Sequence, residues 1–404
     1  MALGSLAKLK HTILTGGFMK FLKFFALISA LILLLASCNR GTTDTSDSTT
    51  DSEITENEVT ETMPQKEYLT KTISLKDAEA LIKPLGRAYY LDSLLTADHA
   101  ASGFEASLDC KGDVSLAITT ANDVKFAITV DGVERKNVTV PAGSSELVIA
   151  TGLEEGLHRI SIINETGFIS GSKVDMTKLT FTGELLAVSS DSKTPYIEFI
   201  GDSISAGYGL SQSEGNNHDS TLAYPYLTAK LLGADYTILA RSGLGVAYSA
   251  GASNIFENVY PYASDSRGKA PYAPTRTPDL VVINLHTNDN YQWYSKGGNK
   301  EGDYYNMATF DAKFDNIIKT RAATYGDVPM IFVFGCMASP NWTLATDRSI
   351  ELLDGKYTEE GYDVAYVILP TDRSGVESHP SAAGAEKQAQ ALCEYIKENY
   401  PEVN

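Results

Sequence analysis

Ser203 stands where an apolar run gives way to a turn flanked by glycines, in the stretch YIEFIGDSISAGYG of residues 196–209. A serine hydroxyl is a weak nucleophile at neutral pH unless a base lies within hydrogen-bond reach and donors stabilise the oxyanion. Gly-Asp-Ser turns also end ordinary strands, so the stretch alone leaves both interpretations open. A nucleophilic Ser203 therefore requires a base and oxyanion donors elsewhere in the chain.

Three histidines in the second half of the chain are candidates for that base, namely His218, His286 and His379. His379 stands in the segment ESHP (377–380), directly before a helical pattern. An imidazole in such a loop can reach a neighbouring loop, although a histidine before a helix is also common as a plain surface residue. His379 is the predicted base because the oxyanion donors described next also stand at the ends of predicted strands, where a loop histidine can reach them.

Two further strand ends carry groups that can bind an oxyanion. One apolar run leads into RSGLG (241–245) and another into HTND (286–289). The predicted oxyanion hole consists of the N–H groups of Ser203 and Gly243 and the side-chain amide of Asn288. Asp202 is expected to shape the turn through local hydrogen bonds.

Aromatic side chains follow the same strand ends, at Tyr208, Tyr291 and Trp293. Aromatic rings in such places either stack on sugar rings or pack in the core, and we assign these three as candidate substrate contacts. His286 either lines the pocket or packs behind its loop. No cluster of His, Cys and carboxylate residues has metal-ligand spacing, so neither a metal nor a cofactor is predicted.

Residues 191–404 are expected to form an α/β domain that positions these groups. Short, almost wholly apolar runs are typical of parallel strands covered on both faces, and ligands bind beyond the carboxyl ends of such strands. The predicted strands are 196–200, 236–240, 280–285, 330–335 and 364–369, and the predicted helices lie near 221–232, 309–324 and 380–398.

Residues 67–190 have a different pattern, which predicts an antiparallel β-sandwich. Strand-like runs at 114–120, 124–130, 145–151 and 158–164 are separated by short turn signals and by no long amphipathic helix. No cluster of catalytic residue types occurs in this part of the chain.

Cys336 and Cys393, which lie in the second half of the chain, are expected to be buried as small apolar side chains.

The N-terminal residues 1–38 are interpreted as a lipoprotein signal peptide, with a true start possibly at Met19. Two lysines precede an apolar stretch of 14 residues from Phe24 to Ser37, which is short for a membrane span and typical of a signal peptide. Cys38 follows Leu-Ala-Ser, an order that resembles a bacterial lipobox, and would carry the lipid anchor. Residues 39–66 are rich in Thr, Ser and acidic residues and are expected to form a disordered tether.

The composition limits the partners of the folded part. The 404 residues have a formal net charge of −18, which makes nucleic acid and anionic membrane surfaces unfavourable partners. A neutral polysaccharide is compatible with this charge.

Taken in order, the blocks GDSISAGYG (201–209), SG (242–243), TND (287–289) and HP (379–380) resemble those of SGNH (GDSL-type) hydrolases. The stretches 86–110, 127–134 and 153–166 resemble the N-terminal jelly roll of carbohydrate esterase family 2. The resemblance implies a jelly-roll β-sandwich followed by a three-layer α/β/α SGNH domain with a parallel central sheet. It also implies a Ser203 nucleophile, a His379 base, no cofactor, and removal of O-acetyl groups from plant polysaccharide such as xylan or glucomannan.

Two positions depart from the superfamily pattern. His286 replaces the usual glycine two residues before Asn288, and Val376 replaces the usual aspartate three residues before His379. The nearby acids Glu377 and Asp372 have other offsets, so the third catalytic member stays open. Several members of carbohydrate esterase family 2 use a Ser–His dyad whose histidine is held by a backbone carbonyl.

Other functions are compatible with the same residues. The chain could be an SGNH lipase or thioesterase acting on longer acyl chains, or a surface glycan-binding protein with impaired catalysis; an extracellular adhesin is a weaker alternative. The expected partner is an acetylated polysaccharide or oligosaccharide, with the membrane contacted only through Cys38 and no obligate protein partner. The expected location is outside the bacterial cytoplasm, on a lipid anchor.

Overall fold

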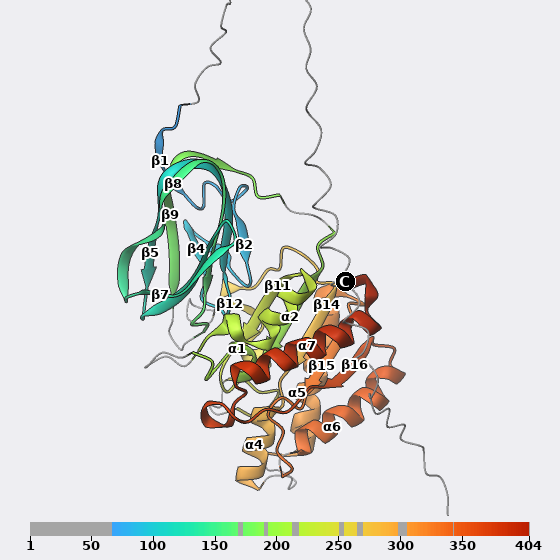
Figure 1. Ribbon diagram of the computed structural model, residues 1–404. Coiled ribbons are helices and arrows are strands. Elements are labelled where there is room, and N and C mark those ends of the chain that lie inside the picture. Colours follow the sequence, from blue (N-terminus) through green and yellow to red (C-terminus); the bar gives the residue numbers. More distant parts are fainter. Residues whose placement is uncertain are drawn as a thin grey trace, which may run out of the picture. The chain divides into compact units, whose positions relative to one another are not determined.

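The computed structural model describes residues 67–168, 173–189, 193–211, 218–249, 254–264, 270–297, 305–341 and 343–403 (Figure 1). The predicted signal peptide with Cys38, and the predicted tether of residues 39–66, lie outside these residues, so both stay predictions. Within the described residues, none of the helices combines the length and the apolar character needed to cross a membrane.

The first part of the described chain is an antiparallel sheet that follows the order β3-β4-β9-β5-β8-β6-β7, with β1 paired to β9 and β2 to β5. Its core forms because alternate side chains of each strand point to the same face. Phe104, Leu116 and Ile162 are buried in that core. The strands are β1 Thr70–Ser74, β2 Lys83–Leu85, β3 Tyr89–Leu91, β4 Leu94–Thr96, β5 Gly103–Thr120, β6 Val124–Val130, β7 Val133–Val140, β8 Gly143–Asn164 and β9 Val174–Leu186.

One strand prediction in this part is wrong in its extent. Residues 145–151 and 158–164 were expected to be two strands separated by a turn, whereas they form the single 22-residue strand β8. The pairing of β8 with β5 changes register between Cys110 and Ser115, so irregular pairing in the middle of the long strands takes the place of a turn. The glycines at 152 and 156 mark this irregularity and do not end the strand.

The second part contains a five-stranded parallel sheet in the order β11-β10-β14-β15-β16. All five predicted strands are present within one or two residues of their expected ends, which confirms the parallel pairing expected from their apolar runs. The strands are β10 Tyr196–Gly201, β11 Asp235–Ala240, β14 Leu280–Asn284, β15 Met330–Phe334 and β16 Val364–Ile368. A separate short pair consists of β12 Tyr262–Ser264 and β13 Ala270–Pro271.

Both faces of the parallel sheet are covered, because successive side chains of a strand point to opposite faces. In β14, Val282 packs with apolar residues of α2 and α7, whereas Ile283 packs with those of α3, α5 and α6. The helices are α1 Ser203–Ala206, α2 Tyr224–Leu232, α3 Phe256–Val259, α4 Thr287–Lys296, α5 Met307–Tyr325, α6 Leu344–Leu352 and α7 Ala382–Asn399. The fold is therefore mixed α/β, and Cys336 and Cys393 are buried as expected.

The antiparallel sheet contributes directly to the core beneath the first helix of the second part. Ala101 and Ile163 belong to the same apolar cluster as Ile204 of α1. The buried guanidinium of Arg87 donates to the backbone carbonyls of Tyr260 and Tyr262, each at 2.9 Å. Residues that precede the parallel sheet in sequence thus help to position the start of α1, where Ser203 lies.

Candidate active site

Ser203 is the first residue of α1, and only Asp202 separates it from the carboxyl end of β10. Its hydroxyl lies 2.8 Å from Nε2 of His379, although the two residues are 176 positions apart in sequence. The side chain of Asp202 caps the helix by accepting a hydrogen bond from the backbone N–H of Ile204 at 2.9 Å. Ser203 is 8% exposed, so its hydroxyl is less open to solvent than a turn position suggested.

The other ring nitrogen of His379 is oriented by the backbone. Nδ1 lies 3.2 Å from the carbonyl oxygen of Val376, and no carboxylate takes this position among the hydrogen bonds of the described residues. Glu377 and Ser378 have φ values of 49° and 60°, a left-handed conformation that non-glycine residues adopt at a cost. This tight turn brings the carbonyl of Val376 back to the ring.

Asp372 holds the loop that carries His379. One carboxylate oxygen accepts hydrogen bonds from the N–H and hydroxyl of Ser374, and the other accepts them from the N–H and hydroxyl of Ser381. These hydrogen bonds, led by that of the Ser374 hydroxyl, lower the pKa of Asp372 to about 2. The carboxylate therefore fixes both ends of the loop without touching the imidazole.

Burial lowers the pKa of His379 from its usual value of 6.5, because a desolvated imidazolium is disfavoured. The carbonyl of Val376 and the charge of Glu377 oppose this shift without reversing it. The neutral imidazole, which is the form that accepts a proton, thus persists as the pH falls below 6.5.

From this shift we expect kcat/KM for a neutral acetate ester to fall on the acid side of its pH profile, with a midpoint below pH 6.5. The activity is lost as the pH falls through the lowered pKa, because protonated His379 cannot take the proton of Ser203. Initial rates between pH 4 and 8 measure the midpoint, with thermal unfolding at each pH as the control for folding. A midpoint at or above pH 6.5 would contradict the assignment of a buried His379 as the base.

The predicted oxyanion donors lie on the strand ends that flank β10. The amide Nδ2 of Asn288 donates to the carbonyl of Leu244 at 2.9 Å and makes a longer contact of 3.4 Å with Asp202 Oδ2. Gly243 has a φ of 81°, a left-handed conformation that a side chain would disfavour. The loop after β11 and the N-terminus of α4 are thereby joined next to Ser203.

Asp289 fixes the loop that contains Gly243. Its fully buried carboxylate accepts hydrogen bonds from the backbone N–H groups of Val246, Ala247 and Tyr248 at 2.7–2.8 Å. Burial raises the pKa of Asp289 to about 7, and the three backbone donors oppose that rise. A Cβ on Gly245 would lie 1.9 Å from the carbonyl oxygen of Tyr248, so only glycine permits this turn.

Tyr208 and His218 form a wall beside the Ser203–His379 pair. The centroid of the Tyr208 ring lies 4.7 Å from that of His379 and 5.2 Å from that of His218. His218 in turn shares a hydrogen bond of 3.0 Å with the hydroxyl of Ser242, the residue before Gly243. Tyr208 thus lies next to the dyad, and its role as a substrate contact stays a prediction. Sequence reasoning did not find the contact between His218 and Ser242.

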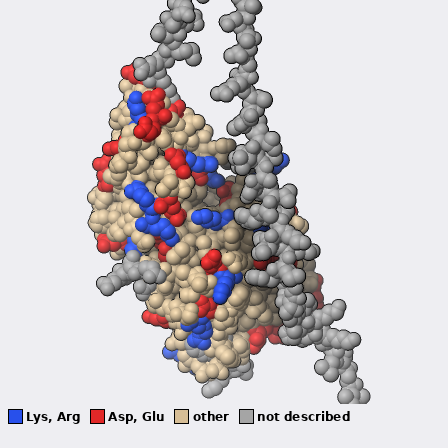
Figure 2. All heavy atoms as spheres, in the orientation of Figure 1, with Lys and Arg blue, Asp and Glu red and all other residues tan. Residues whose placement is uncertain are grey.

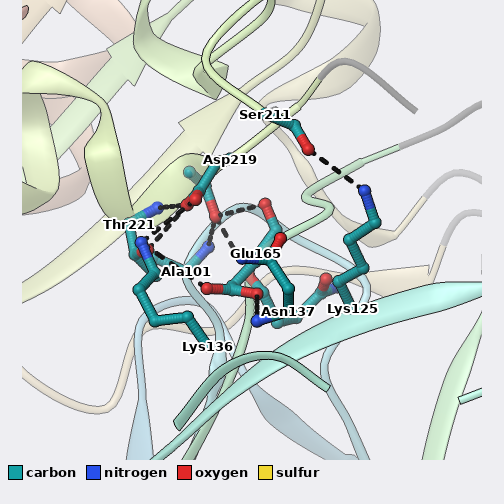
Figure 3. Close-up of polar contacts among 10 residues, drawn as sticks. Ala101, Lys125, Lys136, Asn137, Glu165, Ser211, Asp219 and Thr221 are labelled. Atoms are coloured by element: carbon teal, nitrogen blue, oxygen red, sulfur yellow. Dashed lines mark hydrogen bonds and ion pairs between the residues drawn. The ribbon is translucent and has the colours of Figure 1, made fainter. Parts of the chain in front are cut away.

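The segment that carries His218 is tied to the antiparallel sheet (Figure 3). Asp219 accepts a hydrogen bond from Lys136 at 3.0 Å and caps the following turn through the N–H and hydroxyl of Thr221. The carbonyl of Glu165 accepts the N–H of Ser220 at 2.7 Å. This network holds the segment in place, and no local sequence pattern marks it.

The remaining predicted contacts lie elsewhere. Trp293 is 1% exposed and packs against Tyr248 and Phe310 in the core, so its expected role in stacking on a sugar is wrong. Tyr291 is 48% exposed on α4, and its role as a sugar contact stays a prediction. His286 is buried against Phe334 and lines a separate cavity of about 220 Å³.

The described residues contain no group of three or more His, Cys, Asp or Glu side chains placed to hold a metal ion. Figure 2 shows Lys and Arg interspersed with Asp and Glu on the face of the molecule that it presents. The chemistry available at the strand ends is that of a hydroxyl, an imidazole and hydrogen-bond donors, which suits acyl transfer through serine.

Comparison with known sequences places this geometry among related proteins. Residues 197–392 match the family described as GDSL-like Lipase/Acylhydrolase. The chain is 28% identical over 316 residues to Cellulase/esterase CelE of Acetivibrio thermocellus, covering 74% of this chain and 37% of that protein. It is 24% identical over 220 residues to an acetylxylan esterase / glucomannan deacetylase of Cellvibrio japonicus, covering 50% of this chain and 59% of that protein. The chain thus spans less than two thirds of either relative.

Solved structures agree with the sequence comparison. A family two carbohydrate esterase from Clostridium thermocellum in complex with cellohexaose has a TM-score of 0.70 and 26% identity, covering 80% of this chain and 99% of its own. An acetyl xylan esterase, Est2A, from the rumen bacterium Butyrivibrio proteoclasticus has a TM-score of 0.71 at 18% identity, covering 83% of this chain and 100% of its own, and supports the fold alone.

Proposed function

Because residues 197–392 match the family described as GDSL-like Lipase/Acylhydrolase, we propose that this chain is a serine esterase that removes O-acetyl groups from plant polysaccharide. The observation that carries the proposal is the 2.8 Å contact between the Ser203 hydroxyl and Nε2 of His379 at the carboxyl edge of the parallel sheet. Xylan and glucomannan are the substrates to test first, because both relatives found by sequence have esterase names and one is an acetylxylan esterase / glucomannan deacetylase.

In the proposed reaction, Ser203 attacks the acetyl carbonyl carbon while His379 takes its proton. The sugar oxygen leaves with that proton, and an acetyl group remains on Ser203. Water then attacks the acetyl carbonyl with His379 again as the base, and acetate is released. The carbonyl of Val376 holds Nδ1–H and thereby fixes the tautomer whose Nε2 accepts the proton.

The negative charge of the tetrahedral intermediate is assigned to the N–H groups of Ser203 and Gly243 and the amide of Asn288. The contact of Asn288 with Leu244 is short, whereas its contact with Asp202 is 3.4 Å. The second hydrogen of this amide is therefore the one that an oxyanion can take over. The hydrogen bonds that Asp289 accepts from the loop after β11 keep Gly243 in position while the negative charge develops.

The finer architecture is part of the same proposal. We assign residues 67–190 to a jelly-roll domain and residues 191–404 to a three-layer α/β/α SGNH hydrolase domain. Residues 1–38 are proposed to be a lipoprotein signal peptide that leaves Cys38 as the lipid anchor, and 39–66 a tether that displays the enzyme outside the cytoplasm.

The test is acetate release by residues 66–404 from acetylated xylan and acetylated glucomannan, with a long-chain acyl ester as the comparison. We expect acetate from at least one glycan and little cleavage of the long ester. Cleavage of the long ester alone would replace the proposal by a lipase or thioesterase function. Glycan binding without cleavage of any ester would replace it by a binding protein with impaired catalysis.

A further inference from the structure

A second serine and histidine lie beside the proposed dyad, at the end of the neighbouring strand. Gly201 of β10 pairs with Ala240 of β11, so Ser203 and Ser242 each stand two residues beyond a paired position. The N–H of Arg241 donates to the carbonyl of Gly201 at 3.1 Å, which continues the contact past the strand ends. Because adjacent strands lie about 4.8 Å apart, the segments that carry Ser203 and Ser242 leave the edge of the sheet from neighbouring strands.

The partner of Ser242 also packs against the same aromatic ring as the base. Nε2 of His218 lies 3.0 Å from Oγ of Ser242, and Tyr208 contacts the imidazoles of both His218 and His379. Ser242 is exposed, whereas His218 is half-buried, so the serine is the member of the pair that is more open to solvent. The two serine–histidine pairs therefore border one surface, with Tyr208 between the histidines.

The chemistry of this pair suits a neutral, hydroxyl-bearing ligand. A serine hydroxyl has one hydrogen and two lone pairs, so Oγ of Ser242 can still accept from a ligand in either tautomer of His218. Burial, together with the charge of nearby His379, lowers the pKa of His218 to about 4, so the imidazole is neutral at neutral pH. The second pair thus offers hydrogen bonds without charge.

We propose that Ser242 and His218 form a hydroxyl subsite, which binds a hydroxyl group of the substrate next to the ester that Ser203 attacks. The inference rests on the proposed esterase function and adds a selection rule to it: acetyl esters with a neighbouring hydroxyl, as in sugars, are preferred over plain alkyl acetates. Ser242 is the contact to substrate, and His218 is a positioning residue that orients its hydroxyl.

The test compares two esters of equal carbon chain, 1-monoacetylglycerol, which has neighbouring hydroxyls, and propyl acetate, which has none. We expect Ser242→Ala to lower the ratio of kcat/KM for monoacetylglycerol to that for propyl acetate about fivefold, the effect of one hydrogen bond of ordinary strength. Ser242→Thr should retain the ratio because it keeps a hydroxyl, and His218→Gln should lower it. Ser295→Ala, on the exposed surface of α4, is the matched control and should leave it unchanged.

An unchanged ratio in Ser242→Ala would overturn the subsite. If both esters were then cleaved equally more slowly, Ser242 would instead be assigned to shaping the loop of Gly243. These results are separate from failure of the proposed function, because the ratio needs no polysaccharide. An enzyme that cleaves both small esters but no glycan, with a lowered ratio in Ser242→Ala, would lose the polysaccharide assignment and keep the subsite. Cleavage of neither the small esters nor acetylated glycan would overturn both.

Discussion

Ser203→Ala is expected to lower acetate release at least about a thousandfold while leaving the protein folded. The substitution removes the oxygen that would form the acyl-enzyme, and the oxyanion donors alone provide only the residual rate that remains in serine hydrolases without their nucleophile. The only change to the side chain is loss of the hydroxyl, which lies 2.8 Å from Nε2 of His379. The measurement is the initial rate of acetate release from the best glycan, together with thermal unfolding.

Ser205→Ala is the matched control for this variant. Ser205 lies two residues further along α1, is 1% exposed and shares a hydrogen bond with the hydroxyl of Tyr224 at 3.2 Å. The same substitution there should lower stability slightly and keep most of the activity. If Ser203→Ala retained more than a tenth of the wild-type rate, Ser203 would not be the nucleophile.

His379→Ala is expected to lower kcat about a thousandfold, because Ser203 then lacks a positioned base. The double variant with Ser203→Ala should be no slower than either single variant, since nucleophile and base act as one unit. His158→Ala is the control, because His158 lies on β8 and is bound to Asp131 at 2.7 Å, in the antiparallel sheet. An additive double variant would contradict a shared role for Ser203 and His379.

Glu377→Gln separates a dyad from a triad in the same assay. If the carbonyl of Val376 orients the imidazole, removal of the Glu377 charge should change kcat less than about threefold. It should also shift the acid-side midpoint slightly downward, because the charge of Glu377 raises the pKa of His379. A loss approaching that of His379→Ala would instead make Glu377 the third catalytic member.

Much of the α/β scaffold could be predicted because its signals are local. The strands β10 to β16 of the parallel sheet are apolar runs of five or six residues, and the stripe of Ala385, Ala389 and Leu392 in α7 is buried as its helical spacing suggests. By contrast, α4 went unpredicted because its sequence TNDNYQWYSK has no apolar stripe, and it is held by the burial of Trp293. The same burial overturned the sugar contact predicted for this residue.

The sequence by itself determined the residue types that could do chemistry, Ser203, Gly243, Asn288 and His379, and their order at strand and helix ends. Only the tertiary structure decided which groups meet: the pairing of His379 with Ser203, the carbonyl of Val376 in place of a carboxylate, and the wall made by Tyr208 and His218. The physical reason is that propensity and periodicity act over a few residues, whereas a contact across 176 positions depends on the register of the whole sheet and on the loops that cross its edge.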